Sequence, residues 1–106
     1  PRVVTGDHDT VMACLACGEI SLAAWPILRN RVRFFQSIPD APAMEAMRIL
    51  ARQGIVAGES GVAGLAGLMS LSGENRARVG LTSASRVLVI GTEGATDPEI
   101  YRRIVG

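Results

Sequence analysis

Residues 85–99 constrain the fold of this chain more than any other stretch. Residues 87–90 form a short, unbroken apolar run, which is typical of a strand buried on both faces, as in a parallel sheet. Gly91 and Gly94 follow, and glycine adopts backbone angles that residues with a Cβ resist. The Asp-Pro-Glu sequence at residues 97–99 then supplies an N-cap, a first-turn proline and a first-turn acid. This order predicts a strand, a polar glycine loop and the start of a helix.

The loop at residues 91–96 is a candidate ligand site. Ligands of open α/β sheets bind outside the carboxyl ends of the strands, where such loops lie. Thr92 carries a hydroxyl that can donate to a ring nitrogen or to an oxygen. Glu93 is either a second polar ligand or a surface charge. An ordinary strand-to-helix turn without a ligand has the same pattern, because the inference depends on fold analogy.

Hydrophobic periodicity and turn residues predict the rest of the chain. Asp9 or Thr10 is a possible cap for a helix with Val11, Met12, Leu15 and Ala16 on one face, ended by Gly18. In chain order we then expect a helix from about residue 22 to residue 32, a strand at 33–38, a helix at 40–53, a strand at 55–57, a helix at 62–71, a polar connection at 72–84 that is partly helical around 74–79, the strand at 87–90 and a helix at 98–105. The alternation predicts an α/β fold with parallel-sheet layers and flanking helices.

Length and charge limit the class of protein. The 106 residues suffice for one domain with a modest core. The formal net charge is +1, and no basic stripe is interleaved with aromatic residues, so we expect no nucleic-acid partner. All 11 basic residues are arginines, so the chain has no lysine for a Schiff base. Together with the start at Pro1, this fits a piece of a larger protein.

The sequence shows no signal for membrane insertion or export. No apolar run approaches the roughly 20 residues that a membrane span needs. No charged and then apolar signal opens the chain. We therefore expect no membrane partner and a cytoplasmic location.

Cys14 and Cys17 have the spacing of redox and zinc motifs, but at an unusual place. A thioredoxin-type pair opens a helix after a strand, whereas this pair is predicted near the end of an apolar helix. A structural zinc needs about four ligands, and His8 is the only further nitrogen or sulfur ligand. We expect no metal site here and two buried thiols instead, since a free cysteine behaves as a small hydrophobe. His8 itself, between Asp7 and Asp9, is predicted to lie in a solvated loop.

A second glycine loop, Gly58-Glu59-Ser60-Gly61, precedes the helix predicted at 62–71. Its backbone N–H groups can bind an anion, as helix N-termini do. Alternatively, Glu59 accepts a hydrogen bond from a ligand. Close packing of a helix on a strand would also require glycine here, and the sequence leaves these possibilities open.

Several motifs resemble the diaminopropionate ammonia-lyases. Residues 9–19, Asp-Thr-Val-Met-Ala-Cys-Leu-Ala-Cys-Gly-Glu, are similar to a segment of that family. The matching motifs that follow in the family's order are residues 37–40, 46–50, 58–61, 85–88, 92–97, 101–102 and 104–105. Threonine and serine dehydratases, which share the fold type II of pyridoxal-phosphate enzymes, are looser matches. The resemblance covers nearly the whole chain.

The resemblance implies that residues 1–106 are the C-terminal portion of a pyridoxal-phosphate-dependent lyase and one incomplete α/β domain. Such an enzyme converts 2,3-diaminopropionate, a small amino acid, into pyruvate and ammonia. The lysine that forms a Schiff base with the cofactor lies upstream in the family, so this chain supplies no catalytic residue of its own. The remainder of the same polypeptide is then its partner, and we expect a homodimer of the full-length enzyme.

The resemblance also implies roles for individual residues. Thr92, next to Gly91, matches the position that brings a hydroxyl to the pyridine nitrogen. Glu59 and Ser60 match a loop that lines the cofactor ring. The substrate side is matched by Ala16, Cys17 and Gly18. Cys14 departs from the family pattern, which has glycine there.

Two other functions remain open at this point. One is a threonine or serine dehydratase of the same fold. The other, from a different class, is a non-catalytic α/β module that binds an anion or a nucleotide through the two glycine loops. A dithiol redox or zinc protein is a weaker third possibility.

Overall fold

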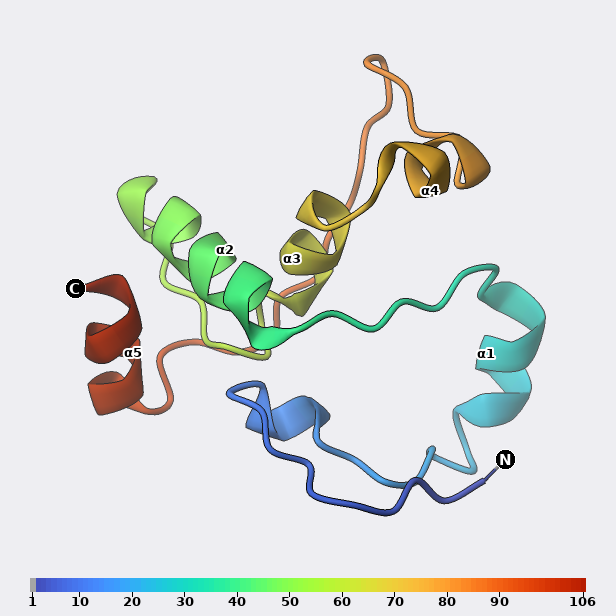
Figure 1. The fold of residues 1–106 in the computed structure, drawn as a ribbon, viewed down its shortest axis with the longest axis horizontal. Coiled ribbons are helices and arrows are strands. Elements are labelled where there is room, and N and C mark those ends of the chain that lie inside the picture. The colour runs from blue at the N-terminus through green and yellow to red at the C-terminus, as the bar shows by residue number, and fades with distance from the viewer. Residues whose placement is uncertain (1) are drawn as a thin grey trace.

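The structure is a computed structural model, and it describes residues 2–106 (Figure 1). The secondary structure of these residues is entirely helical. In chain order the elements are the short 3-10 helix η1 (Ala13–Leu15) and the α-helices α1 (Trp25–Arg31), α2 (Asp40–Arg52), α3 (Ala63–Met69), α4 (Gly73–Arg78) and α5 (Pro98–Val105).

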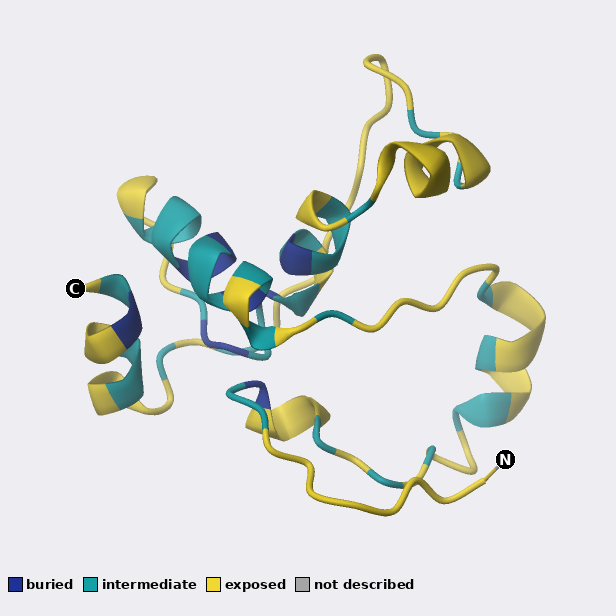
Figure 2. Cartoon of the chain, viewed as in Figure 1, coloured by how far each residue is buried: buried dark blue, intermediate teal, exposed yellow. Residues whose placement is uncertain are grey.

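Helix α2 is the centre of the packing. It contacts α3 on one side and α5 on another, whereas α1 and α4 contact no other helix of the described chain. The buried face of α2 consists of Ala43, Ala46 and Met47. Val62 and Ala66 from the α3 side and Ile104 from α5 complete the core with Met12. Figure 2 shows buried residues on α2, α3 and α5, and α2 contacts each of the other two helices.

The helix ends have the signals that the sequence predicts. The Asp97 carboxylate accepts the N–H groups of Glu99 and Ile100, so it caps α5 as expected. Gly54 has a φ of +74° just after α2, which is the left-handed conformation of a helix C-terminus. Ser72 caps α4 by accepting the N–H of Asn75. The helices predicted at 40–53, 62–71, 74–79 and 98–105 are therefore confirmed.

The predicted strands are not confirmed. Residues 33–38, 55–57 and 87–90 run as irregular chain in the described structure, and no β-ladder joins them to one another. A strand exists only through hydrogen bonds to a neighbouring strand, and these segments have none within residues 2–106. Leu88 is 86% exposed and Ile90 is 75% exposed, so the apolar run is not buried as a strand core would be. The parallel-sheet layers are thus absent from this part of the protein.

The first predicted helix is also wrong. Only the single turn η1 forms, with Met12 at its N-cap position and no side-chain cap. The Thr10 hydroxyl accepts the N–H of Met12 at 3.1 Å and donates to the Asp40 carboxylate, which also accepts the N–H of Val11 at 2.9 Å. The second helix, α1, begins at Trp25 rather than near Leu22, with Ser21 accepting the N–H of Ala24 at 3.2 Å before it.

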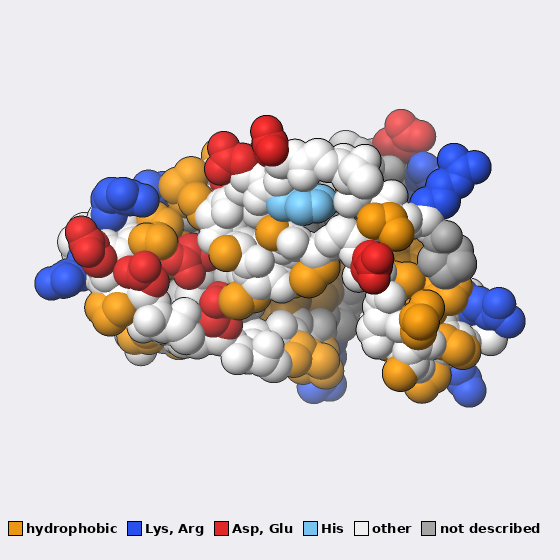
Figure 3. Space-filling view, turned by 90° about the horizontal axis from the view of Figure 1, so that it is seen from below, with side chains coloured by type: hydrophobic (Ala, Val, Ile, Leu, Met, Phe, Trp, Pro, Cys, Tyr) orange, Lys and Arg blue, Asp and Glu red, His pale blue; other side chains and the backbone are white. Residues whose placement is uncertain are grey.

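The described residues form an open arrangement. Their accessible surface is 7996 Å², whereas a folded monomer of 11.2 kDa exposes about 5,700 Å². The radius of gyration is 15.0 Å, against about 13 Å for a compact domain of this length. Hydrophobic side chains lie at the surface among charged ones, as the face in Figure 3 shows. Much apolar surface therefore lacks a cover within residues 2–106. None of the described helices has the length and apolar character that crossing a membrane requires.

Candidate functional site

The two glycine loops of the sequence meet in the structure. We call the contact between residues 58–61 and residues 91–94 the loop junction. Its centre is the carboxylate of Glu93, whose Oε2 accepts the N–H of Ser60 at 2.7 Å and the N–H of Gly61 at 2.9 Å. The backbone carbonyl of Glu93 also accepts the N–H of Gly58 at 3.0 Å. Glu93 thereby joins two segments that are more than thirty residues apart.

Glycine is needed at the loop junction because the backbones approach so closely. A Cβ on Gly58 would lie 2.3 Å from the carbonyl oxygen of Gly94, and one on Gly61 would lie 2.7 Å from the carbonyl oxygen of Glu93. On the other loop, a Cβ on Gly91 would lie 2.9 Å from the carbonyl oxygen of Gly61. Close packing therefore accounts for these glycines, but it is the packing of one loop against the other and not the predicted packing of a helix on a strand.

A third segment, around η1, joins the junction through Cys14. The Cys14 thiol donates to Oε1 of Glu93 at 3.3 Å, and the Cys14 N–H donates to Oγ of Ser60 at 3.2 Å. Beside these contacts lies an open cleft of about 580 Å³. Its lining residues are Cys14, Leu15, Ser60, Gly61, Thr92, Glu93, Gly94 and Thr96. Three separate parts of the sequence thus build one small-residue cleft with several polar groups.

The hydrogen bonds at the junction favour a charged Glu93. Partial burial by itself would raise the pKa of the Glu93 carboxyl. The N–H of Gly61, the Cys14 thiol, the N–H of Ser60 and the Thr96 hydroxyl outweigh this effect and lower the pKa below its ordinary value of 4.5. Glu93 is therefore an anion at neutral pH. The N–H groups of Ser60 and Gly61 bind this internal anion rather than an external one.

Glu59 is a buried acid within the same loop. Its side chain is only 6% exposed, and its Oε1 has no hydrogen-bond partner among the described residues. A buried oxygen without a donor is costly, so such an atom is a candidate acceptor for a group that the described residues do not supply. Glu59 is not one of the residues that line the cleft.

The structure brings together some of the predicted cofactor-side residues. Thr92 and Ser60 both line the cleft. Gly91 does not line the cleft; it lines a separate, smaller pocket of about 260 Å³ with Val89 and Leu65. Glu59 is adjacent to Ser60 in the chain but buried.

The predicted substrate-side residues lie outside the cleft. Ala16, Cys17 and Gly18 do not line it, whereas Cys14 and Leu15 just before them do. The carbonyl oxygen of Gly18 instead accepts the N–H of Val4 at 2.8 Å. The prediction of buried thiols is wrong, since Cys14 and Cys17 are both exposed and free. Cys14 lies in the short 3-10 helix η1, which buries none of its residues, and Cys17 lies just after it.

The sequence does not predict the contact between Glu93 and Cys14. It leaves Glu93 open between a ligand and a surface charge, and it indicates Cys14 only as part of a Cys-x-x-Cys pair and as a departure from the family pattern. Their contacts depend on chain segments that lie 32 to 79 residues away in the sequence. The only local signal was the pair of glycines that flank Glu93 in the loop, Gly91 and Gly94.

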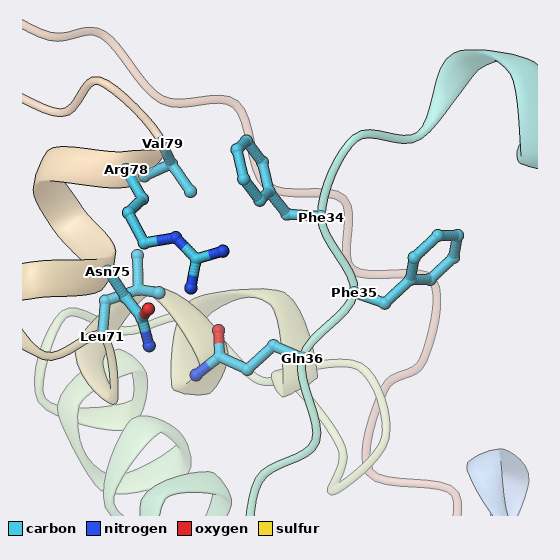
Figure 4. Close-up of a pocket in the computed structure, with 7 residues that line it drawn as sticks. All are labelled: Phe34, Phe35, Gln36, Leu71, Asn75, Arg78 and Val79. Carbon is cyan, nitrogen blue, oxygen red and sulfur yellow. The ribbon is translucent and has the colours of Figure 1, made fainter.

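The other candidate sites remain without support. Among residues 2–106, no three His, Cys, Asp or Glu side chains gather as metal ligands. A separate cleft of about 370 Å³ lies between the segment at 33–36 and the chain around α4 (Figure 4). Phe34 points toward Val79 and Arg78 there, while Phe35 points away. This cleft carries no acid, thiol or hydroxyl among its lining residues.

The chain is similar in sequence to curated ammonia-lyases. The chain is 41% identical over 116 aligned residues to the diaminopropionate ammonia-lyase of Salmonella typhimurium (strain LT2), an alignment that covers 99% of this chain and 29% of that protein. It is 39% identical over 112 residues to the diaminopropionate ammonia-lyases of Escherichia coli K12 and Escherichia coli O157:H7, covering 96% of this chain and 28% of each. The chain therefore spans less than a third of the length of these curated relatives.

A family model for pyridoxal-phosphate dependent enzymes matches residues 1–93, which is most of the chain and includes both glycine loops up to Glu93. The matched region thus contains the whole Gly58–Gly61 loop and the start of the loop after residue 90. On this evidence, the chain belongs to the family of pyridoxal-phosphate dependent enzymes.

Proposed function

We propose that the complete protein is an ammonia-lyase that eliminates the β-amino group of 2,3-diaminopropionate and releases pyruvate and ammonia. The observation that carries this proposal is the identity of 39–41% to three diaminopropionate ammonia-lyases along nearly the whole chain. Identity at that level across both glycine loops favours a shared reaction over a shared fold alone.

The residues around the cleft fit the ring of pyridoxal phosphate better than its phosphate group. The Thr92 hydroxyl and the small residues beside it line an open cleft of about 580 Å³. Oε1 of Glu59 is buried and needs a donor. The N–H groups of Ser60 and Gly61, which could bind a phosphate, already bind Glu93. We therefore assign the ring to this chain and the phosphate to residues outside it.

When bound, pyridoxal phosphate withdraws electrons from the α-carbon of an amino acid, which supports loss of a group from the β-carbon. In our proposal Thr92 donates its hydroxyl proton toward the pyridine nitrogen, with Gly91 allowing the close approach of the loop. A neutral hydroxyl does not force a proton onto that nitrogen as a carboxylate would. Ser60 lines the ring in this proposal, and Glu59, which is buried next to Ser60 in the chain and does not line the cleft, stays a proposed cofactor-side residue. Ala16, Cys17 and Gly18 stay our proposed substrate side, through a rearrangement of the segment after η1.

The exposed apolar segments support an incomplete domain. Residues 33–38, 55–57 and 87–90 have strand-like sequences without neighbours, and Leu88 and Ile90 face solvent. We propose that these segments pair with strands elsewhere in the same polypeptide to form the parallel-sheet layers of a fold type II enzyme. The homodimer and the cytoplasmic location also remain parts of this proposal.

The rival functions have less support. An anion-binding module would need the N–H groups of the Gly58–Gly61 loop, and Glu93 occupies two of them. A dehydratase acting on serine or threonine uses the same fold, so it is the alternative that an assay must separate from the ammonia-lyase.

The test is an assay of the complete protein, loaded with pyridoxal phosphate, on 2,3-diaminopropionate, serine and threonine. The proposal predicts two ammonia molecules per pyruvate from 2,3-diaminopropionate, because the β-amino group leaves and the α-amino group is released by hydrolysis. Turnover of serine or threonine without turnover of 2,3-diaminopropionate would assign the dehydratase function instead. Borohydride should also attach the cofactor to a lysine outside residues 1–106, since this chain has none.

A further inference from the structure

The Gly58–Gly61 loop binds both the side chain and the backbone of Glu93. The Glu93 carboxylate accepts the N–H groups of Ser60 and Gly61, and the Glu93 backbone carbonyl accepts the N–H of Gly58. The Cys14 thiol contacts the remaining carboxylate oxygen at 3.3 Å. Few orientations of the backbone satisfy all of these contacts together. The peptide unit next to Thr92 is therefore held in one arrangement.

We propose that Glu93 is a positioning residue, which sets the direction of the neighbouring Thr92 hydroxyl by holding residues 91–94 on the Gly58–Gly61 loop. This inference depends on the proposed function for the role of Thr92. It assigns to Glu93 no contact with cofactor or substrate. Glu93 acts through the backbone, and Thr92 makes the contact.

The glycines around Glu93 support this role. A Cβ on Gly58 would lie 2.7 Å from Oε2 of Glu93 and 2.3 Å from the carbonyl oxygen of Gly94. A Cβ on Gly61 would lie 3.1 Å from the Cβ of Glu93. The nearest atom in each case is a backbone oxygen, at 2.3 Å for Gly58 and 2.7 Å for Gly61, so these glycines let the two backbones approach closely enough for the Glu93 carboxylate to reach the N–H groups of Ser60 and Gly61.

The chemistry of the contact also suits a permanent anchor. An ionised carboxylate that accepts two backbone N–H groups forms charge-assisted hydrogen bonds, which are roughly twice as strong as neutral ones. The bond lengths of 2.7 and 2.9 Å lie in the range of such bonds. Cys14 adds a third segment, so the anchor also ties η1 to the cleft.

The first test is amide hydrogen exchange of the complete protein without cofactor. Glu93→Leu keeps a side chain of similar size and removes both acceptor oxygens. The Ser60 and Gly61 amides should then exchange roughly tenfold faster than in the unaltered protein. Glu93→Gln keeps one neutral acceptor and should give a smaller increase, which provides a second variant if Glu93→Leu folds poorly. Exchange at both amides unchanged in either variant would overturn the anchor.

The matched control is Glu99→Leu. Glu99 is an exposed acid six residues further along, in the first turn of α5, and it contacts neither glycine loop. The Glu99→Leu variant should leave the amide hydrogen exchange rates of Ser60 and Gly61 within about twofold of those in the unaltered protein. Faster exchange in this control as well would show general loosening and contradict a specific role of Glu93.

The second test measures the bound cofactor. In the loaded protein, Glu93→Leu should weaken retention of pyridoxal phosphate roughly tenfold and change its visible circular dichroism, with Glu93→Gln between the two. Faster amide exchange with an unchanged dichroism and affinity would overturn the positioning role. Absence of 2,3-diaminopropionate turnover in the unaltered protein would contradict the proposed function alone, because the exchange experiment needs neither substrate nor cofactor.

Discussion

The carboxylate of Glu93 accepts the backbone N–H of Gly61 at a distance of 2.9 Å. This bond joins the loop after residue 90 to the loop before α3. Few residues of this chain are buried, and the hydrogen bonds of Glu93 form a well-defined polar contact between the two loops. The close approach of the two loops also explains why residue 61 is glycine, since a Cβ on Gly61 would meet the backbone of Glu93.

A methyl group at the junction should be poorly tolerated. Gly58→Ala puts its Cβ 2.3 Å from the carbonyl oxygen of Gly94, so the two loops must separate. We expect a loss of about 1–3 kcal/mol in the free energy of unfolding of the complete protein, measured by urea denaturation. Weaker retention of pyridoxal phosphate should accompany it.

Gly64→Ala is the matched control for that change. Gly64 lies in α3, and its added Cβ would be 3.6 Å from the Cβ of Val89, an ordinary contact. Alanine is the better helix former, so the protein should gain up to about 1 kcal/mol. Equal losses in the two variants would show that the close approach of the loops does not matter.

Acid should weaken the loop junction. The folded pKa of Glu93 is lowered, so its contribution to stability is complete above the ordinary value of 4.5 and is lost as the pH falls below it. The unfolding midpoint of the complete protein should therefore differ between the unaltered protein and Glu93→Gln at about pH 7, and this difference should shrink toward about pH 4. A difference that is constant over this range would contradict an ionised anchor.

Asp40 should control how the segment before η1 attaches to α2. Its carboxylate accepts the Thr10 hydroxyl and the N–H of Val11, and it lies in the first turn of the helix. Asp40→Ala leaves both donors without this partner, and we expect a loss of about 1–3 kcal/mol in stability with faster exchange of the Val11 amide. Asp7→Ala, at an exposed position in the same segment, should change neither quantity. An unchanged Val11 exchange rate in Asp40→Ala would refute the assignment.

Two arginines of α2 should differ in their effect on α5. Nε of Arg48 donates to the carbonyl oxygen of Ile104 at 2.9 Å, which ties the end of α5 to α2. Arg52 makes only an exposed pair with Glu45 at 3.3 Å. Arg48→Met should cost about 1 kcal/mol and speed amide exchange in α5, while Arg52→Met should cost less than about 0.5 kcal/mol. Equal effects on α5 exchange would argue against the Arg48 contact.

Local sequence signals predicted the helices whose ends carry their own caps. Asp97 and Ser72 supply side-chain caps, and Gly54 supplies the left-handed residue, so α2, α4 and α5 lie close to where the sequence indicates. The strands could not be settled in this way, because a strand depends on a neighbour and residues 87–90 have none among the described residues. The helix expected after Thr10 does not extend beyond the single turn η1, and its first residues are held by the distant carboxylate of Asp40, which accepts the Thr10 hydroxyl and the N–H of Val11.

The candidate site was predictable only where local sequence motifs mark its residues. The glycine loops pointed to Ser60 and Thr92, and both line the cleft. Glu93 could not be assigned, because its donors come from residues 60 and 61 and from Cys14, far away in the sequence. Ala16, Cys17 and Gly18 are assigned by resemblance alone, and they are not among the residues that line the cleft.

The role of Thr92 is measured most directly by the dissociation constant of pyridoxal phosphate from the complete protein. Thr92→Ala removes the hydroxyl from the cleft, and Thr92→Ser keeps it. We predict that the alanine variant binds the cofactor about tenfold or more weakly, and that the serine variant stays within about threefold of the unaltered protein. Equal affinities and equal visible spectra in all three proteins would contradict the assignment of this cleft to the cofactor.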